Sequence, residues 1–128
     1  MLHSDDLLRY RIDRANESLE DARISLEGSR LRNALNRIYY AGFYIVGALA
    51  LKHNFSTAKH YTLIGWFNKN FVKTKLVDIE TGKTLLRAFE VRQESDYDDY
   101  VEYDSEEVLH LYNEMVQFIK VVKKLIYP

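Results

Sequence analysis

Three long stretches of this chain place apolar residues in alternating steps of four and three, which is the spacing of one face of an α-helix. A helix with such a stripe has to bury it against other helices, and a period close to a heptad predicts shallow crossing angles. The sequence therefore predicts an all-α fold, an up-and-down antiparallel bundle of four main helices plus one short helix. The stripes are Leu8, Ile12, Ala15, Leu19, Ala22 and Leu26; Leu31, Leu35, Ile38, Gly42, Ile45 and Leu49; and Val108, Tyr112, Met115, Ile119, Val122 and Ile126.

The helices are expected to be long because the chain has few residues that break helices. Only one proline and five glycines occur in 128 residues. Gly42 and Gly47 each cost a helix about 1 kcal/mol relative to alanine, so they indicate close approach of a neighbouring helix. We expect helices over about 4–27, 30–53, 58–71, from 81 onward and over 105–126, a connection over 72–80, and one domain over 1–128.

Composition excludes several kinds of site. The chain has no cysteine, so disulfides, thiolate metal sites and thiol catalysis are ruled out. No phosphate-binding glycine loop is present, and no cofactor is expected. The longest uncharged run, Ile38–Leu51, is too short to span a bilayer, and the first residues lack a signal-peptide core. These features predict a cytoplasmic protein without a membrane partner.

The segment Arg92–Asp104 departs most from ordinary helix packing, because it sets one cation among six carboxylates and three tyrosines. Arg92 continues the stripe of Leu85 and Phe89, so its stem is expected to point inward. One interpretation is an i,i+4 ion pair with Asp96, and spacing alone favours it. The other is a contact with an anion, most naturally a phosphate, which suits a planar guanidinium.

The acids and tyrosines of this segment have several possible uses. Asp96, Asp98 and Asp99 could hold a divalent cation, although a solvated loop explains them better because no glycine folds the segment back. The tyrosines could stack on bases, pack in the core with their hydroxyls in contact with water, or be sites of modification. They step by three along the chain and are Tyr97, Tyr100 and Tyr103.

Aromatic residues widen the apolar surface of the second expected helix nearly all round. Tyr40 is among them, and we regard it as a candidate binding residue. A helix of this kind is central to a bundle or shared with a second subunit, so we expect a homodimer. His60 is expected in the first turn of a helix, where a neutral imidazole suits the helix dipole; such a histidine is more often structural than catalytic.

The chain resembles the HEPN domain family, in particular its short single-domain archaeal and bacterial members. The resemblance rests on residues 35–44, on Lys59-His60 ahead of Trp66-Phe67, and on residues 70–74 and 92–97. It implies a helical bundle, usually a homodimer, with a link to RNA or nucleotides. Many members are metal-independent ribonucleases, often the toxin of a toxin–antitoxin pair whose partner is a minimal nucleotidyltransferase.

The catalytic pattern of that family is an arginine followed, after four to six residues, by a histidine. Arg92 matches the arginine, but Tyr97 and aspartates stand where the histidine is expected. A tyrosine, with a pKa of about 10, is a poor base at neutral pH compared with an imidazole. The departure puts catalysis, rather than the family, in question.

Two hypotheses follow from the resemblance. In the first, the protein is a ribonuclease toxin in which Arg92 holds the scissile phosphate, Tyr97 or Asp96 orients the 2′-hydroxyl, and His60 assists from a distance. In the second, it is a non-catalytic dimeric partner of a minimal nucleotidyltransferase, and Tyr97 and Tyr100 lie on its docking or adenylylation surface.

Overall fold

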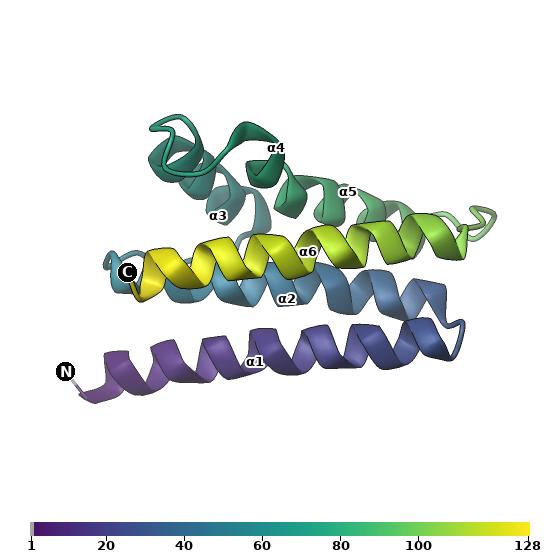
Figure 1. Cartoon of the computed structure of the whole chain (residues 1–128), viewed down its shortest axis with the longest axis horizontal. Helices are drawn as coiled ribbons and strands as arrows, with labels where there is room; N and C mark the ends of the chain where they lie inside the picture. Colours follow the sequence, from purple (N-terminus) through teal and green to yellow (C-terminus); the bar gives the residue numbers. More distant parts are fainter. Residues whose placement is uncertain (1) are drawn as a thin grey trace.

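The chain folds into an all-α bundle, as the apolar stripes predict. The computed structural model describes residues 2–128, with side chains from residue 5 onward, and no strand occurs in that part of the chain. The four main helices run up and down, and a region of short helices connects the second of them to the third (Figure 1). The elements are α1 (Leu2–Glu27), α2 (Leu31–Lys52), α3 (His60–Phe67), the π-helical turn η1 (Asn68–Val72), α4 (Ile79–Gly82), α5 (Thr84–Tyr97) and α6 (Ser105–Ile126).

The central element is α2, which packs against α1, α3, α5 and α6. In Figure 1, α1 lies along one side of α2 and α6 while α3, α4 and α5 lie along the other. By length and composition alone α2 could cross a membrane, but 67% of its most apolar window is buried inside the bundle. Its hydropathy therefore reflects a core position.

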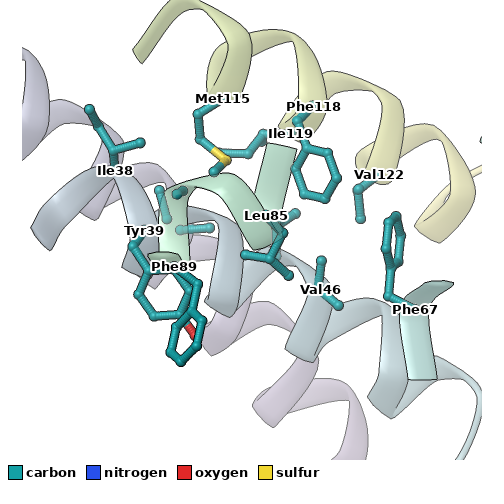
Figure 2. Packing of buried hydrophobic residues seen from close by; sticks show 14 of the residues in the cluster. Ile38, Tyr39, Val46, Phe67, Leu85, Phe89, Met115, Phe118, Ile119 and Val122 are labelled. Atoms are coloured by element: carbon teal, nitrogen blue, oxygen red, sulfur yellow. The ribbon is translucent and has the colours of Figure 1, made fainter. Parts of the chain in front are cut away.

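The core is the set of apolar side chains between α2, α5 and α6, with Phe67 of α3 closing one end (Figure 2). Phe67 and Phe118 meet edge to face with ring centroids 5.4 Å apart. Gly42 allows α6 to approach α2, because a Cβ there would lie 2.7 Å from Met115 Cε. The expected close approach at Gly42 is thus present, whereas Gly47 is covered by the side chain of Arg11 instead.

The short elements differ from the sequence prediction. The helix expected over 58–71 begins at His60 and becomes π-helical after Phe67. The expected connection over 72–80 contains part of α4, where the Asp78 carboxylate accepts a hydrogen bond from the Thr81 backbone N–H at 3.3 Å. The apolar pattern gave no sign of a one-turn helix, because so short an element is stabilised by its cap rather than by a stripe. The first helix begins at Leu2, ahead of Ser4, whose side chain lies outside the described part.

Truncating a core aromatic should destabilise the bundle strongly. Phe118→Ala removes a fully buried ring from α6, and we expect the free energy of unfolding to fall by about 3–5 kcal/mol. Leu109→Ala, on an exposed position of the same helix, should change it by about 0.5 kcal/mol or less. Urea denaturation followed by circular dichroism measures both; equal losses would contradict the assignment of the core.

Candidate functional site

Arg92 lies on the inward stripe of α5, next to the buried side chains of Leu85 and Phe89. Its side chain is only 19% exposed. The guanidinium carbon lies 5.6 Å from the ring centroid of Tyr39 and 5.3 Å from that of Tyr40. Two aromatic faces therefore hold the cation by cation–π attraction while burying its stem. The expectation that Arg92 points inward is correct.

The ion pair expected between Arg92 and Asp96 is present. Arg92 Nε lies 2.9 Å from Asp96 Oδ2, but the N–H is not aligned for a hydrogen bond and the buried Nε is left without one. The contact is therefore electrostatic and not the bidentate fork that guanidinium and carboxylate form in strong pairs. Since the Asp96 side chain is 39% exposed, the pair adds only a few tenths of a kcal/mol, and an anion could compete for the same guanidinium.

His60 joins this cluster through Tyr39. The Tyr39 hydroxyl and His60 Nδ1 are 2.5 Å apart, and the imidazole stacks on Phe89 with centroids 5.4 Å apart. Burial, and secondarily the charge of Arg92, lower the pKa of His60, while burial raises the pKa of Tyr39. A neutral phenol and a neutral imidazole share this hydrogen bond, and donation by the Tyr39 hydroxyl would leave the His60 proton on Nε2.

Sequence reasoning missed Tyr39, which it counted only as apolar surface. The signal was present in the sequence, because a tyrosine buried at the centre of a bundle needs a partner for its hydroxyl. Tyr39 is fully buried and contacts both Arg92 and His60. It is the residue that links the cation and the imidazole.

Tyr97 and Tyr100 are exposed and do not belong to this cluster. Tyr97 ends α5 and is 84% exposed, and Tyr100 lies in the following loop and is 95% exposed. Of the three tyrosines that step by three, only Tyr103 packs: its hydroxyl donates to Glu94 Oε1 at 3.4 Å and its ring faces the Arg32 guanidinium at 5.6 Å. The structure thus brings His60, Tyr40 and Asp96 close to Arg92 or its aromatic neighbours, and leaves Tyr97 and Tyr100 in solvent.

The loop over 98–104 is shaped by Arg32 of α2. Its guanidinium donates to the backbone carbonyls of Ser95 and Val101, the latter at 2.6 Å, and more distantly to those of Asp98 and Asp99. Sequence reasoning did not single out Arg32.

Two of the acids in this segment have local structural roles. The Asp98 carboxylate accepts from the Tyr100 backbone N–H at 3.0 Å, and Asp104 accepts from Glu106 N–H at 3.1 Å as the N-cap of α6. Among the side chains of residues 5–128, no group of three histidines, aspartates or glutamates is placed to hold a metal ion.

Comparison with known proteins identifies the family. A HEPN domain model matches residues 8–125. The chain belongs to the HEPN domain family. A UPF0332 protein of Thermotoga maritima is 40% identical over 126 residues, which cover 98% of this chain and 96% of the relative. A protein of Methanocaldococcus jannaschii named "Putative toxin MJ0142" is 33% identical over 123 residues, covering 91% of this chain and 84% of the relative.

The HEPN pattern implied by the resemblance is only half present at this site. Arg92 supplies the arginine, and Tyr97 is a solvent-exposed residue at the position of the expected histidine. A histidine of α3 lies beside the arginine cluster instead, since His60 and Arg92 both contact Tyr39. In this HEPN protein the cation and the imidazole therefore come from different helices.

The lowered pKa of His60 should make stability depend on pH. Below about pH 6.5, His60 binds a proton more readily in the unfolded chain than in the folded one. The free energy of unfolding should therefore fall as pH decreases through that range. His60→Gln should flatten this dependence between about pH 7.5 and about pH 5.5, measured by urea denaturation. The same slope in wild type and variant would show that His60 is not the responsible group.

Proposed function

We propose that this HEPN protein is an RNA-binding toxin that cleaves RNA without a metal ion. The observation that carries the proposal is the position of Arg92, a mostly buried guanidinium held against two tyrosine rings and paired with one imperfectly aligned carboxylate. A cation held in this way is preorganised to stabilise the charge that develops on a phosphate during transfer. The toxin names of relatives support the same biological role.

The residues around Arg92 suggest a division of tasks. Arg92 would hold the scissile phosphate, and Asp96 would orient the 2′-hydroxyl and accept its proton as the 2′ oxygen bonds to phosphorus. The bond from phosphorus to the 5′ oxygen breaks, and that oxygen takes a proton from water. His60, with its Nδ1 occupied by Tyr39, would offer the Nε2 proton as a second hydrogen-bond donor rather than act as the base.

A homodimer is part of this proposal, since the family pattern places two copies of the site across one cleft. Tyr61, which is exposed at the start of α3, offers an apolar surface for it. Tyr61 packs edge to face on Phe89 with centroids 4.8 Å apart, so this surface adjoins the ring that stacks on His60. Pairing there would bring the two Arg92 clusters toward each other.

Removing the guanidinium should abolish cleavage. Arg92→Gln keeps a polar side chain without the charge, and we expect metal-free cleavage of RNA by the purified protein to fall by about 100-fold or more. The assay is run with EDTA, and Arg23→Gln on α1 serves as the matched control. Equal cleavage by wild type and Arg92→Gln would refute the proposal.

A second candidate function is favoured by the exposure of Tyr97 and Tyr100. These hydroxyls stand on an acidic segment that Arg32 holds in place, which is a suitable presentation for a modifying enzyme. In this alternative the protein is a non-catalytic partner and substrate of a minimal nucleotidyltransferase. The absence of a histidine at the motif spacing after Arg92 is consistent with it.

Intact-mass spectrometry tests the alternative. After incubation with a minimal nucleotidyltransferase from a HEPN gene pair and ATP, the wild-type chain should gain the mass of one or more adenylyl groups. Tyr97→Phe or Tyr100→Phe should remove that gain, whereas Tyr127→Phe, another exposed tyrosine, should keep it. An unchanged wild-type mass would argue against this role.

A further inference from the structure

A continuous line of arginines and tyrosines leads away from Arg92 across α2 to α1. We call it the Arg–Tyr strip and define it as Tyr10 and Arg14 of α1 with Arg37, Tyr40 and Tyr44 of α2. We propose that the Arg–Tyr strip binds single-stranded RNA and guides it to Arg92. The inference rests on the proposed ribonuclease function and names the form of RNA that this site takes and the residues that bind it.

The members of the strip contact one another in order. The Tyr40 ring has Arg92 at 5.3 Å and Arg37 at 5.4 Å, and its centroid lies 6.0 Å from that of Tyr44. Arg14 lies 5.1 Å from the Tyr44 ring and also donates to the Tyr44 hydroxyl at 3.2 Å. Tyr10, which is 55% exposed, completes the line at 6.0 Å from Arg14.

The strip occupies the face of α2 that the bundle leaves open. Residues 38, 42, 45 and 49 of α2 are buried and lie on one side of the helix, where Gly42 meets Met115 of α6. At 3.6 residues per turn, Tyr40 and Tyr44 lie on the opposite side. Both stay only partly buried, although Arg14 of α1 contacts Tyr44 and Arg92 of α5 contacts Tyr40.

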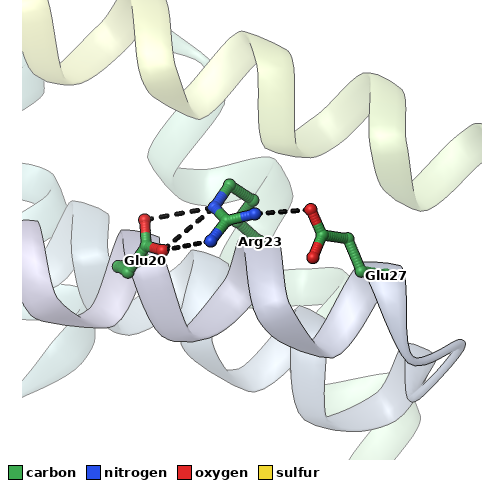
Figure 3. A network of polar contacts seen from close by, with 3 residues as sticks. All are labelled: Glu20, Arg23 and Glu27. Carbon is green, nitrogen blue, oxygen red and sulfur yellow. Dashed lines mark hydrogen bonds and ion pairs between the residues drawn. The ribbon is translucent and has the colours of Figure 1, made fainter.

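The charges of the strip's arginines are compensated only weakly, since Glu17 attracts Arg14 without forming an ion pair with it. Neither Arg14 nor Arg37 forms an ion pair with a carboxylate of the described residues; Arg37 donates to the neutral Asn36 side chain instead. Arg23, on the same helix as Arg14, shows the contrast: Glu20 and Glu27 bind it from both sides (Figure 3). The strip therefore attracts anions although the whole chain has a net charge of −1.

The strip is also hollowed beside Tyr44. A pocket of about 220 Å³ opens between α1, α2 and the segment before α3, and Phe43, Tyr44 and Arg11 line it together with the hydroxyls of Ser56 and Thr57. Aromatic walls with a few hydrogen-bonding groups suit an unpaired base. A base seated there would leave its phosphate near Arg14.

These features select single strands over duplexes. Stacking on tyrosine or guanidinium planes requires bases that are free of a complementary strand, and it tolerates any sequence. Arginines alternating with the rings meet the phosphates between successive bases. A duplex hides its base faces, so it could engage only the charges.

The experiment measures binding of a fluorescent 2′-O-methyl oligouridylate, which lacks the attacking hydroxyl, by anisotropy over a range of KCl concentrations. Wild type should bind it more tightly than a duplex of equal length. Arg14→Gln and Arg37→Gln should each reduce the slope of log affinity against log salt by about 0.7, the value for one lost phosphate contact on a single strand. Tyr44→Leu should weaken binding by about 5-fold or more.

Arg23→Gln is the matched control and should bind as wild type does, and thermal melts verify that each variant is folded. If Arg14→Gln and Arg37→Gln bound the oligonucleotide with the salt slope and affinity of wild type, the proposed role of the Arg–Tyr strip would be refuted, even if Arg92→Gln abolished cleavage. If the strip variants bound RNA more weakly but the wild-type protein did not cleave RNA, the RNA-binding role of the strip would stand and the proposed ribonuclease function would be refuted. A shift in the monomer–dimer equilibrium of the strip variants, with the salt slope unchanged, would assign this face to a second copy of the chain and overturn the proposal.

Discussion

Burial of α2 on most of its circumference is the constraint on which the rest of the structure depends. This helix has apolar or aromatic residues on nearly every side, so α1, α3, α5 and α6 all pack against it. Gly42 lets α6 come close on one side. The opposite side, which carries Tyr40 and Tyr44, is the part that the helices of one chain cover only partly.

The candidate site arises from the same constraint. A tyrosine at the centre of a bundle must find a hydrogen-bond partner for its hydroxyl, and Tyr39 finds it in His60 at the first residue of α3. Its ring then provides an apolar and polarisable surface for the guanidinium of Arg92. A packing requirement of the core has thereby brought together an imidazole from α3 and a cation from α5, two helices that do not pack extensively against each other.

The main helices and the inward direction of Arg92 could be predicted because they follow from helical periodicity, which is local in sequence. The pairing of Arg92 with Asp96 was predictable for the same reason, since the two residues are four positions apart. His60 and Tyr39 are 21 residues apart in the sequence. Their contact depends on the direction that the turn over 53–59 gives the chain, which helical periodicity does not predict. The one-turn helix α4 escaped prediction because its Asp78 cap and the close contact of Gly82 with Val72 determine it.

Arg32 has a consequence for how the acidic tyrosine-bearing loop can be recognised. Its guanidinium binds carbonyls at Ser95 and Val101, and Tyr103 packs on it. A loop fixed in this way has already lost most of its conformational freedom before any partner arrives. Association with the loop would therefore cost little ordering entropy, so that even a small complementary surface could bind it with useful affinity.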